Sequence, residues 1–155
     1  MAKKKTNTSS ANKKVVEALR VVVADTYALM GQTHLCHWNV EGPSFFALHT
    51  AFEEQYTELF AAVDEIAERI RALDAYSPGG LKSLSDIAGM NNLPEKVGAE
   101  KMVASLVEDH AKLIKDAGKA RDLAGDADDN ETEDLMIARI QVHEKTVWML
   151  KSFLK

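Results

Sequence analysis

Apolar side chains recur at alternating three- and four-residue steps over residues 45–73, and this is the clearest pattern in the sequence. Such steps place the side chains in one stripe along an α-helix. A soluble helix of about 30 residues needs neighbours along its whole length. The stripe consists of Phe45, Leu48, Phe52, Tyr56, Leu59, Val63, Ile66, Ile70 and Leu73.

The segments around this helix are also predicted to be helical. The first helix is expected from about residue 13 to residue 39, with Asn12 as its N-cap, and Gly42-Pro43 ends it in a tight turn. Ser44 is in position to cap the second helix. Residues 1–11 are basic and then rich in Ser and Thr, which predicts a flexible tail, and residues 12–155 form a single domain.

The second half of the chain repeats this organisation. A third helix is expected over residues 100–124 and a fourth from about residue 131, with an acidic turn between them. Their inward-facing residues are expected to be Met102, Leu106, Leu113, Ala117 and Ala120 in the third helix and Met136, Ile140, Val147, Leu150 and Leu154 in the fourth. A short helix is expected near residues 81–88, inside the long middle connection. Tight turns make consecutive helices antiparallel, and the long connection can cross the whole bundle. The predicted fold is therefore all-α, a four-helix bundle of the ferritin-like kind with one long crossover.

Composition limits the partners and the cellular location that are expected for the protein. The 155 residues carry a net charge of −5, so the whole surface should repel nucleic acid unless positive charge is concentrated locally. Such a concentration occurs near the start of the chain, at Lys3, Lys4, Lys5, Lys13 and Lys14. No secretory signal is expected, and no apolar stretch is long enough for a membrane span. The single cysteine, Cys36, fits a reducing cytoplasm.

Five polar residues are candidate metal ligands. They are His37, His49, Glu53, Asp64 and Glu68. On a helical wheel the last three lie within about 100° of His49, beside the apolar stripe. Phe60 is interleaved with the acids, which suggests contact with another subunit. The alternative is an ordinary charged surface.

Distance favours a site shared between subunits. His49 and Asp64 are separated by roughly 22 Å along one helix, so they cannot bind one ion in the same chain. Two copies packed antiparallel through this face would bring the histidine end of one helix to Asp64 and Glu68 of the other. Mixed imidazole and carboxylate ligands suit iron, zinc or manganese. A di-iron site inside the bundle is not expected, because no histidine has a Glu three residues before it.

Two segments carry a resemblance to a known family. HWNVEGPSFFALH at residues 37–49 and DEIAERI at residues 64–70 closely resemble the signature of Dps proteins, the DNA-binding proteins from starved cells. Residues 129–150 also resemble the last helix of that family.

This resemblance implies a hollow dodecamer that oxidises ferrous iron, usually with hydrogen peroxide, and stores the ferric product as mineral. His37, His49 and Glu53 would come from one subunit, and Asp64 and Glu68 from its partner. Many family members have Asp where this chain has Glu53, so a working but differently occupied second iron position is expected. Zinc or another divalent metal can substitute for iron in such a site.

Other polar residues have more than one interpretation. Asp134 and then Asp129 best match carboxylates that line the iron-entry pores of the family, although acids are expected at a helix N-terminus from its dipole alone. His110 and His143 are expected to be buried and hydrogen-bonded. Trp38 is interpreted as a buried anchor of the turn, with radical quenching beside His37 as the alternative.

The lysines of the tail leave two functions open. The first is an iron-oxidising and iron-storing cage that protects DNA from oxidative damage. The alternative is a non-enzymatic, nucleoid-associated protein that compacts DNA through its lysine-rich tail. Twelve tails on one shell would bind DNA phosphates together, so weak contacts would add up. The tail could instead serve only solubility.

Overall fold

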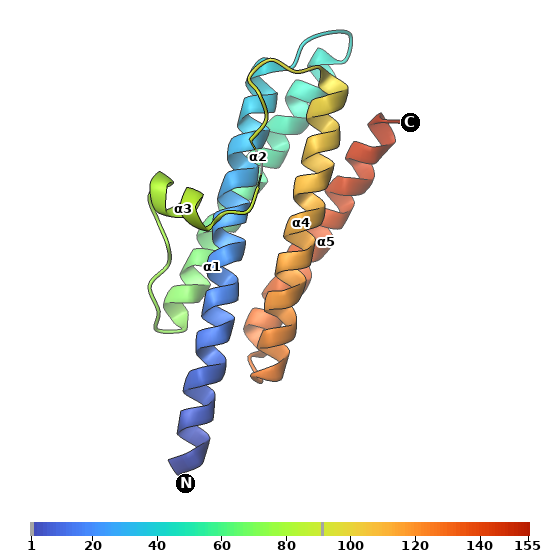
Figure 1. Ribbon diagram of the computed structural model, residues 1–155. Coiled ribbons are helices and arrows are strands. Elements are labelled where there is room, and N and C mark those ends of the chain that lie inside the picture. Colours follow the sequence, from blue (N-terminus) through green and yellow to red (C-terminus); the bar gives the residue numbers. More distant parts are fainter. Residues whose placement is uncertain (1, 91) are drawn as a thin grey trace.

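The computed structural model describes residues 2–90 and 92–155, and over these residues it contains five helices and no strand (Figure 1). The helices are α1 (Ala2–Asn39), α2 (Phe45–Ala72), α3 (Leu81–Ile87), α4 (Ala99–Asp126) and α5 (Asn130–Phe153). The predicted all-α four-helix bundle with a short helix in the crossover is confirmed.

Two antiparallel hairpins form the bundle. α1 and α2 make one hairpin and α4 and α5 the other, and α1 packs against α4 to join them (Figure 1). The turn between α1 and α2 contains Gly42, whose φ of 100° is a conformation that side chains with a Cβ rarely adopt. The crossover runs from the end of α2 to the start of α4 at the opposite end of the bundle, and α3 packs on α1.

The predicted apolar stripes make the core. Phe52, Leu59, Ile66 and Ile70 of α2 are at most 1% exposed, and the inward residues of α4 are also buried. Close packing of these stripes against α1 and α5 removes their apolar surface from water, which is the main stabilising contribution to folding. Leu154, predicted to end the α5 stripe, is instead 42% exposed because the helix ends at Phe153.

The predicted start of the first helix is wrong. α1 begins at Ala2 and passes without interruption through the residues expected to form a tail. No Pro or Gly occurs before Gly31, so nothing in the sequence breaks the helix there. The side chains of residues 2–9, including Lys3, Lys4 and Lys5, lie outside the described part of the structure.

A buried carboxylate fastens the crossover to the bundle. Asp25 of α1 is fully buried, accepts a hydrogen bond from the Gly89 amide at 2.8 Å, and pairs with Lys112 of α4 at 2.5 Å. Burial raises the pKa of Asp25, while the bonds from Lys112 and Gly89 oppose that rise.

None of the described helices is long and apolar enough to cross a membrane.

Candidate metal centre

His37 and His49 meet where α1 passes into α2. Their rings are stacked with centroids 3.7 Å apart, although twelve residues separate them in the chain. His37 is buried and His49 is half-buried. The tight turn at Gly42 returns the chain so that both histidines lie at the same level, as the sequence predicts.

Each of these histidines is oriented by the backbone of the other. His37 Nδ1 lies 2.8 Å from the carbonyl oxygen of His49, and His49 Nδ1 lies 2.8 Å from the carbonyl oxygen of His37. A carbonyl only accepts, so both Nδ1 atoms must carry the proton and donate it. Each Nε2 of a neutral ring then keeps its lone pair, which is the form in which histidine binds a metal ion.

Aromatic side chains hold the two rings in place. Tyr56 lies edge-on to His37 with centroids 5.2 Å apart, and Phe45 stacks on His49 at 4.9 Å. His34 packs against Tyr56 and Trp38, and burial followed by the nearby charge of His37 lowers its pKa. Trp38 is 69% exposed, so its interpretation as a buried anchor is wrong: its ring lies over His34 on the surface.

The three acidic candidates lie on the surface of α2. Glu53, Asp64 and Glu68 are exposed, and all belong to one unbroken helix with His49. The structure therefore brings His37 and His49 together but leaves Asp64 and Glu68 about 20 Å or more from His49 along the axis. Within the described part of one chain, no group of three or more His, Cys, Asp and Glu side chains could hold a metal ion.

Exposed aromatic residues flank these acids. Phe60 is 69% exposed and Phe46 is 81% exposed, both on α2. Large apolar side chains mixed with charges on one helix face are typical of a surface that meets another protein. The surface of α2 that carries the candidate acidic ligands thus resembles a protein–protein interface.

Asp129 serves as a helix cap. It accepts hydrogen bonds from the backbone amide and the hydroxyl of Thr132 at 3.1 and 2.6 Å, as the N-cap of α5. It also pairs with Arg69 of α2 at 2.7 Å. Asp134 is exposed and has no ion pair among the described residues. Of the two pore candidates, only Asp134 presents a carboxylate that these contacts leave available.

A hydrogen-bonded chain runs through the bundle core. Arg139 of α5 makes a bidentate ion pair with Glu58 of α2 and lies 3.3 Å from His143 Nε2. His143 Nδ1 lies 2.9 Å from His110 Nδ1. Both histidines are at most 2% exposed, which confirms that they are buried and hydrogen-bonded. Burial lowers the pKa of His110 to about 4 and that of His143 to about 2.

Sequence reasoning missed three members of the core polar group. Glu58 and Arg139 are separated by 81 residues, and no spacing rule links them. Asp109, beside His110, is also buried, and burial raises its pKa to about 6. An acid interrupting the inward stripe of α4 was the available signal for Asp109, since a charged residue there needs a partner or a proton.

A family model described as the Ferritin-like domain matches residues 16–155. The chain is 38% identical to DNA protection during starvation protein 2 of Bacillus anthracis over 143 residues, which cover 92% of this chain and 98% of that protein.

Solved structures show the same relationship. The crystal structure of a Dps protein from Bacillus brevis superposes with a TM-score of 0.91 at 37% identity, covering 94% of this chain and 98% of that one. A Dps protein from Vibrio cholerae, described as a member of the ferritin-like diiron-carboxylate superfamily, has a TM-score of 0.91 at 32% identity and covers 94% of this chain and 92% of its own.

Proposed function

The chain belongs to the Dps family of ferritin-like proteins, and from this premise we propose that it oxidises ferrous iron at sites shared between two subunits. The ferric product is stored inside a hollow homododecamer. Iron is thus substrate and cargo, and hydrogen peroxide is the oxidant. Removal of both reactants protects DNA in the cytoplasm from oxidative damage.

The chemistry assigned to each residue follows from its donor atoms. The Nδ1 hydrogen bonds of His37 and His49 leave Nε2 of each ring as the atom that can bind ferrous iron. Asp64 and Glu68 of the partner subunit, with Glu53, supply negative oxygen ligands that favour the ferric state. Two ferrous ions give two electrons to one peroxide, whose O–O bond breaks, and water supplies the remaining oxygen of the ferric oxyhydroxide while protons are released. A paired two-electron reduction avoids hydroxyl radical.

One observation carries this proposal most strongly. The reciprocal hydrogen bonds of His37 and His49 fix both rings in the metal-binding tautomer, while the described residues of one chain do not assemble three or more ligands around an ion. Such orientation by an outer hydrogen bond is a regular feature of metal-bound histidine. A prepared but incomplete pair of ligands is what a site completed by a second subunit requires.

The first test is oxidation by hydrogen peroxide after anaerobic loading with ferrous iron. Ferric absorbance is followed in the wild type and in Asp64→Asn, with Glu65→Gln as the control because it removes the neighbouring exposed carboxylate of the same helix. Asp64→Asn should slow oxidation by about 100-fold, as expected for loss of a ligand or its support. Equal rates in wild type and Asp64→Asn would contradict the shared site.

DNA compaction is a second candidate function. The Bacillus anthracis relative is named for DNA protection, and this chain carries a cluster of lysines near its start. Deletion of residues 2–9 separates the two functions, because it removes Lys3, Lys4 and Lys5 and leaves the candidate iron ligands in place. Unchanged iron oxidation with weakened DNA binding is the result expected if the protein does both.

A further inference from the structure

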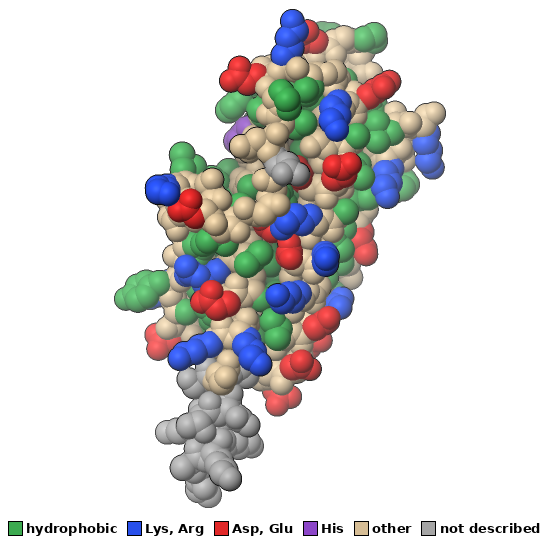
Figure 2. Space-filling model, viewed as in Figure 1, with side chains coloured by type: hydrophobic (Ala, Val, Ile, Leu, Met, Phe, Trp, Pro, Cys, Tyr) green, Lys and Arg blue, Asp and Glu red, His purple; other side chains and the backbone are tan. Residues whose placement is uncertain are grey.

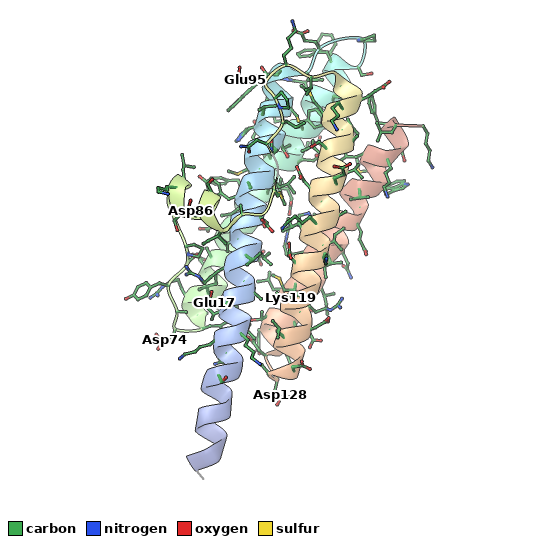
Figure 3. The ribbon with its side chains drawn as sticks, in the orientation of Figure 1. Glu17, Asp74, Asp86, Glu95, Lys119 and Asp128 are labelled. Carbon is green, nitrogen blue, oxygen red and sulfur yellow. The ribbon has the colours of Figure 1, made fainter. Side chains whose placement is uncertain are left out.

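A groove lies between α1 and α4, close to the start of the bundle. Its volume is about 590 Å³, and its charged lining residues are Lys13, Lys14, Glu17, Asp116 and Lys119. Figure 3 labels Glu17 on α1 and Lys119 on α4 at the same level of the two helices. The groove is therefore formed by two packed helices of the bundle, and its described lining does not depend on residues 2–9.

The lysines of this groove lack acidic partners. Lys13, Lys14 and Lys119 are exposed and form no ion pair with the described residues. The two acids of the groove are already occupied. Glu17 lies 3.7 Å from Arg20, and Asp116 lies 2.7 Å from Lys112.

The local charge is opposite to that of the whole chain. Lys112 also pairs with Asp25, so the groove residues and their direct partners comprise five basic and three acidic side chains. The complete chain has a net charge of −5. Figure 2 shows Lys and Arg side chains over this part of α1 and α4, with Asp and Glu side chains between them. A local excess of positive charge on an acidic protein attracts anions to that place alone.

We infer that this groove binds the phosphate backbone of duplex DNA. Unpaired lysines bind phosphates without reading sequence, and Ser10 in the lining adds a hydroxyl that can donate to a phosphate oxygen. Ala18, Val21 and Leu123 form the apolar floor of the lining, but none of the exposed large apolar side chains of the described chain, which insertion into a lipid surface would need, belongs to it.

This inference rests on the DNA-binding candidate function and specifies its site, and it is independent of iron oxidation. According to this inference, part of the DNA-binding surface belongs to the folded bundle and not to the first residues of the chain. Lys119 is the decisive residue, since it comes from α4 and lies far from Lys14 in the sequence but beside the same groove. Repetition of the groove on several subunits would strengthen weak contacts.

The test measures binding of a fluorescent duplex over a range of salt concentrations. Lys119→Glu should weaken binding roughly tenfold or more at low salt and reduce the salt slope by about 1 for each groove engaged. Lys101→Glu is the matched control, because it makes the same change in an exposed, unpaired lysine about 27 Å away along α4. Circular dichroism and native mass confirm that each variant is folded and assembled.

The outcomes separate the inference from the function on which it rests. Selective loss of binding in Lys119→Glu supports the groove. Equal weakening in Lys119→Glu and Lys101→Glu would overturn it, since only total charge would then matter. Unchanged binding in Lys119→Glu, with loss on deletion of residues 2–9, assigns DNA to the tail alone. Absence of DNA binding by the wild type, or preference for vesicles of anionic lipid, contradicts both the groove and the DNA function.

Discussion

The histidine pair His37 and His49 shows how much a single residue depends on its neighbours. The sequence places both histidines around one turn, but their tautomers follow only from the two carbonyl groups that the rings meet. Because each carbonyl belongs to the opposite histidine, the pair is a self-supporting unit.

The buried histidines His110 and His143 predict sensitivity to acid. Their pKa values in the folded chain are about 4 and about 2, below about 6.5 for an unfolded histidine. The unfolded state therefore binds more protons below about pH 6.5, and stability is lost as the pH falls toward 4. Asp109, with a pKa of about 6, acts in the opposite sense over the same window. The losses from the two histidines and the gain from Asp109 leave a net decrease in the free energy of unfolding on the order of 3 kcal/mol.

Urea unfolding at pH 7 and pH 4.5 measures this effect. His143→Gln should flatten the pH dependence, because glutamine does not titrate, whereas Asp109→Asn should steepen it by removing the opposing group. Identical pH dependences in the wild type and both variants would show that other groups control stability in acid.

Asp129 leads to a prediction that separates a cap from a pore carboxylate. Asp129→Ala removes the N-cap of α5 and the ion pair with Arg69. The free energy of unfolding should therefore fall by about 2 kcal/mol. Asp129→Asn keeps a cap acceptor and should lose less. Thermal unfolding and the rate of iron uptake are both measured, and slow uptake with unchanged stability in Asp129→Ala would instead favour the pore role.

At the scale of elements, the long crossover is held by one polar cluster. Asp25→Ala removes the acceptor of the Gly89 amide and the partner of Lys112, so the connection before α4 should open more readily. Hydrogen exchange of residues 86–90 should accelerate about tenfold or more, and the free energy of unfolding should fall by about 3 kcal/mol.

Asp116→Asn is the control for this change. It also touches Lys112, but as a partly exposed pair one turn along α4. Loss of such a pair should lower the free energy of unfolding by about 0.5 kcal/mol or less. Equal exchange in Asp25→Ala and the wild type would mean that packing of α3 on α1 holds the crossover without Asp25.

At the scale of the whole molecule, mixed subunits test the shared site directly. His49→Ala and Asp64→Ala each damage one half of every site, so each protein alone should be inactive. In a dimer of one subunit of each kind, one site receives both defects and the other receives none. Random mixing after dissociation should therefore restore about one quarter of wild-type ferroxidase activity.

Stopped-flow absorbance of the mixed and unmixed proteins provides the measurement. A mixture of wild type with an unfolded control chain, treated identically, accounts for losses during dissociation and reassembly. Sites formed within one chain would give no recovery on mixing, whatever the assembly state.

The sequence by itself determined the helices, their antiparallel pairing, the inward stripes and the candidate ligands on α2. These features depend on short-range periodicity and on turns a few residues long, so spacing alone predicts them. Predictions from spacing were least accurate at the ends of the helices. The start of α1 and the exposure of Leu154 depend on where favourable contacts stop, which periodicity does not record.

Only the tertiary structure decided which polar groups meet. The Glu58 to His110 chain, the pairing of Asp129 with Arg69, and the lysines of the α1–α4 groove join residues that lie on different helices and far apart in the sequence. A side chain on a helical face has many possible partners, and packing of the helices selects one. The sequence therefore supplied the chemical groups, and the bundle determined their protonation, pairing and exposure.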